Sequence, residues 1–332
     1  MRQIEIEWVG INRKVTADLI ETKNPNLCNL LWEMLPYNSL QSHALVSGDH
    51  LYHVVPSWRL VWEQAMYKED RTKSPDGTVF LSQLQHLAVK YGVLSEYIPA
   101  APVGQVIAEH IPILKQAGLE IWDAAYRTKQ IVEVRVTRKG EKADSFAIAA
   151  APPCVSPSVD ALVREIVAET QRIWVNPPEE LLDIHCGKIK SGAGSKGQYF
   201  TTMLFVNGEQ RPFGYGALGG LVRSCFNTDL PVEALKQIAG NFIKTPAEFL
   251  GYCGVDKQWD YTQRTMAVLK DVHTKEDFVT LMSALGTYAN CLNGWNLHYF
   301  PWAHGEQYKI GENHKVGAKV AAPTVRITSP LA

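Results

Sequence analysis

The sequence has no long apolar run and no surplus of charge of either sign. No stretch of 18 consecutive apolar residues occurs in its 332 residues, so no membrane-spanning helix is predicted. The opening residues, MRQIEIEWVG, alternate charged and apolar positions and lack the apolar centre of an export signal. The net charge of −1 gives no electrostatic reason to bind nucleic acid or an anionic membrane. We therefore expect a cytoplasmic protein with neither of these partners.

Motifs for metals, disulfides and common nucleophiles are also lacking. The ten histidines contain no H-x-x-x-H or H-E-x-x-H pair, so we expect no metal site. The six cysteines have no C-x-x-C spacing, and without an export signal free thiols are predicted. No G-x-S-x-G, P-loop or kinase signature is present. The sequence thus excludes several large enzyme classes.

What the chain does have is an ordinary globular composition, with 46% apolar and 20% charged residues. Its length allows two domains, each with its own core. The Ala/Pro-rich stretch Ala147–Pro157 is the best candidate boundary. We predict a domain at residues 1–150, a second at 154–310 and an extended tail at 311–332.

The first half alternates in the manner of strands. Ile4, Ile6 and Trp8 alternate with glutamates, and similar patterns occur at 14–19, 79–81, 87–89 and 131–136. Two helices interrupt them. One is expected after Asn24, as its cap, and ends at Pro36; the other is expected at 105–117, kinked at Pro112 and ended by Gly118. Strands interleaved with short helices predict a closed barrel.

The second half has the spacing of helices. Ser156–Pro157 opens one helix, and Thr274–Asp277 opens a long one. A third is expected to start at the capping box Thr245–Glu248. The Gly-rich stretch 187–220 is expected to interrupt the helices, with a strand after Gly197 and a turn at 207–213. The fold class is therefore α+β.

The stretch Glu21–Pro56 resembles a known family. Glu21, Asn24–Pro25, Leu35–Pro36, His43 and Ser47–Gly48 resemble the pattern of bacterial cyclophilin-like barrel proteins, and Asp76–Gly77 and Tyr91–Gly92 fit its later parts. Small barrels of that kind end near residue 154, whereas this chain continues as helices. A cyclophilin-like barrel followed by a helical bundle resembles the cucumopine and mikimopine synthases, which are opine synthases, over about residues 1–310.

The resemblance implies an activity. Such enzymes condense L-histidine with 2-oxoglutarate in a Pictet–Spengler cyclisation: the amine forms an iminium, which an imidazole carbon then attacks. Only water is lost, so no hydride and no cofactor is implied. The site needs cations for the carboxylates, a general acid/base, and an aromatic wall that excludes water from the imine.

Candidate residues follow from these needs. His43, Glu21 and Tyr91 are the catalytic candidates, since they lie on or beside the residues that carry the barrel resemblance. Arg211 and Arg223 flank a Gly-rich turn and are favoured among the cations. The substrate-binding candidates are Arg59, Lys188, Arg211, Arg223, Trp58 and Tyr215. Each also has an ordinary structural interpretation, such as a hydrogen-bonded wall residue or a solvated surface charge.

Two glycine patterns keep a second function open. Gly192–Gly197 and Gly214–Gly219 both fit G-x-G-x-x-G, the signature of dinucleotide sites. Neither has the required strand before it and helix after it, so a loop, a lid or a close helix approach is favoured. An NAD(P)H-dependent reductive opine synthase and a non-catalytic, prolyl-isomerase-like binding module remain as alternatives. Product stereochemistry, the keto acid and a homo-oligomeric state are not determined by these residues.

Overall fold

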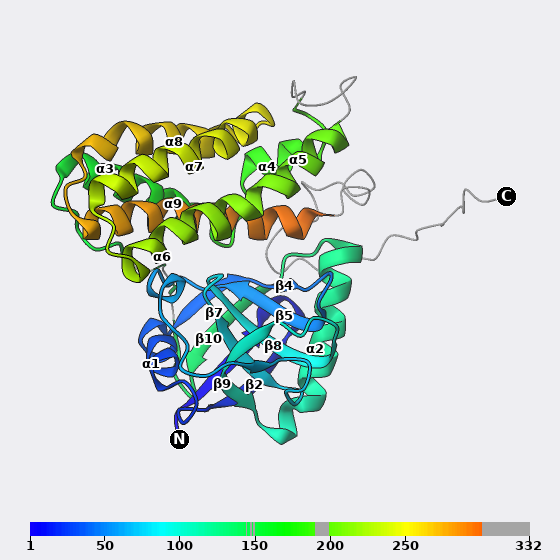
Figure 1. The fold of residues 1–332 in the computed structure, drawn as a ribbon. Helices are drawn as coiled ribbons and strands as arrows, with labels where there is room; N and C mark the ends of the chain where they lie inside the picture. Colours follow the sequence, from blue (N-terminus) through cyan, green and yellow to red (C-terminus); the bar gives the residue numbers. More distant parts are fainter. Residues whose placement is uncertain (144, 147, 149, 190–198, 301–332) are drawn as a thin grey trace.

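Strands occupy the first half of the chain and helices the second (Figure 1). The computed structural model describes residues 1–143, 145, 146, 148, 150–189 and 199–300. The predicted tail at 311–332 and the first glycine pattern lie outside these residues. The last long strand ends at Arg138 and the first helix of the second half begins at Pro157, on either side of the predicted boundary.

The strands form one curled antiparallel sheet. In spatial order it runs β3-β10-β1-β2-β9-β7-β8-β5-β4, with β6 paired to β9. The edge strands β3 and β4 are separated in sequence only by Gln41, so the two edges meet and the sheet forms a nearly closed barrel. The strands are β1 (Gln3–Trp8), β2 (Arg13–Leu19), β3 (Tyr37–Leu40), β4 (Ser42–His43), β5 (Gly48–Val54), β6 (Glu69–Asp70), β7 (Thr78–Ser82), β8 (His86–Leu94), β9 (Pro99–Val106) and β10 (Glu133–Arg138).

Alternation places one face of each strand inside the barrel. Ile4, Ile6 and Trp8 are fully buried there, as their spacing predicted. Two helices, α1 (Pro25–Met34) and α2 (Ile111–Asp123), pack against the barrel and complete its core.

Two details of the barrel differ from the predictions. The second helix begins at Ile111, because residues 99–106 pair as strand β9; Pro112 therefore occupies the first turn and produces no kink. Gly118 lies inside this helix rather than at its end. Asn24 precedes α1 but does not cap it, because its side chain bonds instead to the backbone of Tyr67 and Pro102.

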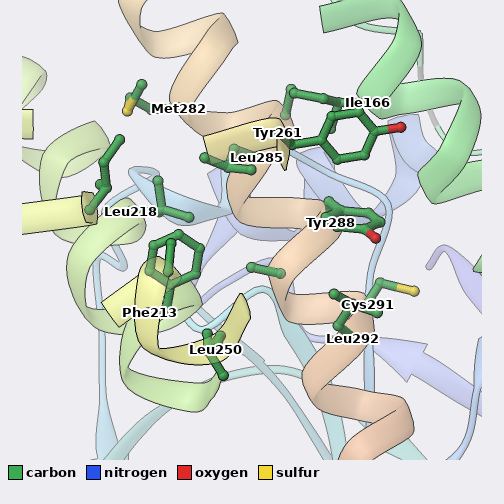
Figure 2. Packing of buried hydrophobic residues seen from close by; sticks show 14 of the residues in the cluster. Ile166, Phe213, Leu218, Leu250, Tyr261, Met282, Leu285, Tyr288, Cys291 and Leu292 are labelled. Atoms are coloured by element: carbon green, nitrogen blue, oxygen red, sulfur yellow. The ribbon is translucent and has the colours of Figure 1, made fainter. Parts of the chain in front are cut away.

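The helical half consists of α3 (Pro157–Ile173), α4 (Glu179–His185), α5 (Tyr199–Arg211), α6 (Gly219–Asn227), α7 (Val232–Tyr252), α8 (Asp256–Val268) and α9 (Lys275–Tyr299). Its long last helix, α9, is the axis of the bundle. It starts after Thr274, as predicted, and the Thr274 side chain caps it by accepting from the Asp277 amide. Met282, Leu285 and Leu292 of α9 pack among apolar residues of the surrounding helices (Figure 2).

Two predictions for this half were wrong. No helix starts at Thr245, because α7 runs from Val232 to Tyr252 with Pro246 inside it. From Tyr199 onward the chain forms helix α5 rather than strand and turn, and a π-helix at Pro212–Leu218 (η6) joins it to α6. Packing on α9 outweighs the local signals here, since Phe213 and Leu218 are fully buried in the same core.

Hydrogen bonds between polar side chains join α9 to the barrel. Gln85, at the β7–β8 turn, donates to the Thr287 hydroxyl at 3.0 Å and accepts from the Asn290 amide at 3.0 Å. On another side, the Trp174 indole donates to the Asn38 carbonyl at 2.6 Å. These bonds, of which the two at Gln85 are fully buried, fix the orientation of the helical half on the outer face of the sheet.

Candidate active site

A cavity of about 600 Å³ lies between the outer face of the sheet and the helical half. The outward-facing side chains of three strands form the floor of this cavity. Leu51 and Leu87 point into the barrel core, and because side chains alternate along a strand, their neighbours in β5 and β8 point outward. The residues of the floor are His50 and Tyr52 from β5, Phe80 and Ser82 from β7, and His86 and Ala88 from β8. The helical half contributes Arg211, Tyr215 and Arg223.

Arg71 and Glu96 form an ion pair in the cavity wall. Arg71 follows β6, and Glu96 follows the end of β8. The Arg71 guanidinium donates to Glu96 Oε2 and, through Nε, to the Glu96 carbonyl at 3.0 Å. Ser47 Oγ donates to the same Oε2 at 3.1 Å. No described residue donates to Oε1, so one oxygen of this carboxylate is available to a ligand.

Glu63, the other carboxylate of the lining, differs in this respect. Its Oε1 accepts from the Asn26 amide at 2.8 Å, and its Oε2 lies 3.6 Å from the Arg59 guanidinium. Both oxygens therefore already have partners. Glu96 is the better candidate for moving a proton.

A hydrogen-bond chain crosses the junction of the two halves at His86. Its Nε2 lies 2.7 Å from the Tyr215 hydroxyl, which accepts from the Asn293 amide at 3.2 Å. The Tyr215 proton is thus available to Nε2, which leaves Nδ1–H as the ring's remaining donor. This chain ties the sheet to η6 and α9 at the edge of the cavity.

Burial keeps two histidines of the floor neutral. Desolvation lowers the pKa of both His50 and His86 to about 3, and the positive charge of Arg71 adds to the effect at His50. His50 Nε2 is buried without a hydrogen-bond partner among the described residues. Neutral imidazoles at these positions can orient a polar ligand without adding charge.

The remaining cations of the lining have no carboxylate partner. No described aspartate or glutamate lies within 4.0 Å of the charged atoms of Lys68, Arg211 or Arg223. Burial lowers the pKa of Arg223, whose Nη2 donates to the Tyr215 carbonyl at 3.4 Å and to no other described residue. Unpaired cations beside a cavity favour an anionic ligand.

The three catalytic candidates from the sequence lie away from this cavity. His43 Nε2 lies 2.6 Å from the Tyr91 hydroxyl, and both side chains are buried. Glu21 forms a surface ion pair with Arg2. None of the three lines the cavity.

The binding candidates divide into two groups. Arg211, Arg223 and Tyr215 line the cavity together. Arg59 pairs with Glu33 on the surface, Lys188 pairs with Asp183, and Trp58 packs on the core of the helical half.

The second glycine pattern forms helix rather than a phosphate loop. Gly214 and Gly216 lie in η6, and helix α5 precedes them where a dinucleotide site needs a strand. A side chain at Gly214 would contact Asn290 Oδ1 at 2.2 Å, so this glycine permits the close approach of η6 to α9. Among the described residues, no group of three His, Cys, Asp or Glu side chains is placed to hold a metal ion. No described helix is long and apolar enough to cross a membrane.

Sequence reasoning missed Arg71, Glu96 and His86. Each lies at or just beyond a strand end, where side chains often reach a site. The sequence feature that could have indicated Glu96 is a charged residue shortly after the end of a strand. Many charged residues on the protein surface occupy the same kind of position, so the feature is not specific.

Two comparisons with known proteins bear on this site. Residues 159–299 match the family described as the cucumopine synthase C-terminal helical bundle domain. A solved structure described as McbB in complex with tryptophan is 59% identical, with a TM-score of 0.89, and the match covers 92% of this chain and 99% of that one. The comparison with curated proteins finds no match. At 92% coverage, the match with McbB extends over both the strand-built half and the helical half.

Proposed function

This chain belongs to the family of McbB and the cucumopine synthases, and from that premise we propose that its cavity carries out a Pictet–Spengler condensation of an aromatic amino acid with a carbonyl acid. The observation that carries the proposal is the free Oε1 of Glu96 in a cavity lined by unpaired cations.

The reaction makes two bonds and loses one water. The amine attacks the carbonyl carbon, and the resulting hydroxyl leaves as water to give an iminium. A carbon of the aromatic ring then attacks the iminium carbon, and the ring proton is lost. Substrates and product balance without a hydride.

Glu96 is the proposed acid and base. Its protonated form gives a proton to the leaving hydroxyl, and the carboxylate then removes the ring proton. Arg71 and Ser47 hold Oε2, so Oε1 has a fixed direction toward the substrate.

The unpaired cations hold the substrate carboxylates. Arg211 and Arg223 lie on the helical side and Lys68 on the barrel side. Two-pronged guanidinium contacts would orient each acid. Arg71 is already neutralised by Glu96 and contributes less net charge to this task.

Apolar side chains shield the iminium from hydrolysis. Tyr126, Leu297 and Phe300 form one apolar part of the lining, and Tyr52 and Phe80 form part of the floor. Excluding water matters because an iminium reverts to amine and carbonyl when water attacks it.

Two amine substrates are proposed. Tryptophan is the first, because the highly similar McbB was solved with tryptophan bound. L-histidine with 2-oxoglutarate is the second, because residues 159–299 match the cucumopine synthase domain. Indole and imidazole both offer a nucleophilic ring carbon at the distance that a six-membered ring requires.

Mass spectrometry tests the function directly. Purified protein is incubated without added cofactor with tryptophan or histidine, each with 2-oxoglutarate or glyoxylate. We expect a product at the summed mass less one water that resists borohydride, with one amine strongly preferred. The same incubations with E96Q protein control for the uncatalysed reaction.

Other outcomes would replace the proposal. A product two hydrogens heavier, formed only with NADPH, would establish reductive opine synthesis. No product from any pair would favour the binding-module interpretation of the barrel.

A further inference from the structure

Lys129 is a buried lysine whose described hydrogen-bond acceptors are all backbone carbonyls, and its Nζ also lies 5.7 Å from the centroid of the Tyr126 ring. It directly follows the π-helix Ala124–Thr128 (η4), and only 1% of it is exposed. Its Nζ donates to the carbonyls of Ala125 at 2.8 Å, His298 at 2.9 Å and Phe300 at 2.8 Å. An ammonium has three hydrogens, so these bonds use all of its donors. No described carboxylate lies within 4.0 Å of Nζ, and burial lowers the pKa of Lys129 to about 7, so the three carbonyls are what stabilises its charged form.

A second bond runs in the opposite direction. His298 Nε2 lies 3.2 Å from the Lys129 carbonyl, and since a carbonyl only accepts, the ring nitrogen donates. Two hydrogen bonds of opposite direction therefore join residues 129 and 298, and we call this pair the Lys129–His298 clamp. It connects the end of α9 to the segment after α2, which lie beside each other in Figure 1. The helix-end carbonyls carry partial negative charge, which favours a cation there.

The clamp joins the two elements that supply one apolar wall of the cavity. Tyr126 lies in η4, three residues before Lys129. Leu297 lies in the last turn of α9, and Phe300 directly follows that helix. The Tyr126 hydroxyl also donates to the His43 carbonyl at 2.6 Å, which fixes the ring from its other end. Lys129 and His298 themselves do not line the cavity.

We propose that the Lys129–His298 clamp is a positioning device that sets the spacing between Tyr126 and the Leu297–Phe300 wall, and thereby selects the aromatic ring of the amine substrate. The inference rests on the proposed condensation. It differs from a role in stability alone, because the clamp sets the distance between Tyr126 and the side chains of Leu297 and Phe300, and the substrate's aromatic ring is proposed to lie against these side chains. If the clamp is removed, the cavity is expected to discriminate less between the two-ring indole of tryptophan and the one-ring imidazole of histidine.

Substitution of Lys129 tests the inference. K129M removes the ammonium and its three hydrogen bonds while keeping a side chain of similar volume, and K129R keeps a cation at this position. K270M is the control, because Lys270 is exposed and lies outside the cavity. The measurement is kcat and KM for tryptophan and histidine with one carbonyl acid. We expect K129M to raise KM for the preferred amine and to reduce the ratio of the two kcat/KM values by about tenfold. K129R restores part of that ratio, and K270M leaves it unchanged.

A ligand-free measurement separates failure of the clamp from failure of the proposed reaction. Hydrogen exchange of the amides at 125–128 and 296–299 is expected to be faster in K129M than in the unmodified protein. Faster exchange or a lower Tm with an unchanged amine ratio would show a role in stability alone and overturn the proposal. Unchanged exchange would overturn it even if the unmodified protein turns over no amine. If K129M does not fold, H298Q, which keeps a side-chain N–H donor, compared with H298A decides by the same two measurements.

Discussion

The Tyr215 hydroxyl, on the helical half, lies 2.7 Å from Nε2 of His86, on the sheet. Neither half alone can build this contact, and the cavity lies on the surface between them. The aromatic rings also meet edge-on, with centroids 5.1 Å apart. The site is therefore a property of the assembled protein.

Removing that hydroxyl is expected to affect both stability and activity. Y215F leaves His86 Nε2 and the Asn293 amide without their buried partner, which should cost about 1–3 kcal/mol of unfolding free energy. We expect kcat/KM to fall as the His86 ring loses its orientation. Urea unfolding and steady-state kinetics check this, with Y261F, outside the cavity, as the control. An unchanged kcat/KM in a folded Y215F variant would show that the orientation of the His86 ring does not matter for activity.

Neutralising Glu96 is expected to abolish proton transfer while keeping the fold. E96Q should lower kcat by about 10²–10⁴, the usual contribution of a positioned acid/base. E63Q is the matched control, because Glu63 lines the same cavity with both oxygens engaged. If E63Q loses as much activity as E96Q, the assignment of Glu96 is wrong.

Removing an unpaired cation is expected to weaken binding of a substrate acid. R223Q should raise KM by about tenfold or more, since a hydrogen bond between charged groups contributes about 1.5–3 kcal/mol. The control is R264Q, which breaks ion pairs with Glu165 and Asp260 outside the cavity. A carbonyl substrate without a carboxylate separates the two acids. If Arg223 holds the carbonyl acid, the deficit of R223Q disappears with the neutral analogue. An equal deficit with both carbonyl substrates would show that Arg223 instead holds the amino-acid carboxylate, and no deficit with either would contradict a binding role.

The buried histidines predict acid lability. Burial lowers the pKa of His50, His53 and His86 from their ordinary value of 6.5 to about 3. Between these two pH values the unfolded chain binds more protons than the folded chain, so stability falls as the pH falls. Each histidine contributes about 1.4 kcal/mol per pH unit in that window. Urea unfolding at pH 7, 6 and 5 measures the slope, and a flat profile would contradict neutral burial.

Two helical glycines are expected to respond to alanine with opposite signs. A Cβ at Gly118 would lie 2.5 Å from the Tyr91 ring, whereas nothing lies within 4 Å of one at Gly240. G118A should therefore destabilise the protein by about 1–3 kcal/mol through overpacking. G240A should stabilise it by up to about 1 kcal/mol through helix propensity. Thermal unfolding of both variants checks this, and a stabilised G118A would show that Tyr91 moves freely.

The sequence was sufficient for the barrel and the α+β class, because alternating strands and helix starts leave local signals such as Ile4-Ile6-Trp8 and Thr274–Asp277. The family came instead from a resemblance, carried by short motifs such as Leu35–Pro36 and by a barrel followed by helices. It was insufficient where packing overrode those signals. Pro246 and Gly214 read as breaks, yet α7 and η6 continue through them because both pack in the core around α9.

The site was harder to predict because a strand has two faces. His43 was the histidine chosen from the sequence, but it lies opposite Leu51 on the inner face of the sheet, whereas His50 lies on the face that the helical half covers. The helical half covers one face of the sheet, and which face this is depends on contacts between residues more than 100 positions apart, such as His86 with Tyr215. Arg211 and Arg223 were chosen because they flank the glycine pattern 214–219, which also contains Tyr215, and the structure places all three in the cavity lining.

The place of α9 at the centre of the bundle has a consequence for synthesis on the ribosome. The barrel is complete in sequence at Arg138, and domains tend to fold as they emerge. Helix α9, which packs against most of the other helices, is made after every other described element. The nascent barrel would expose Tyr52, Phe80 and His86 to water and to chaperones until residues 275–299 leave the exit tunnel. Conditions that slow translation late in the message should therefore affect yield more than the same delay near its start.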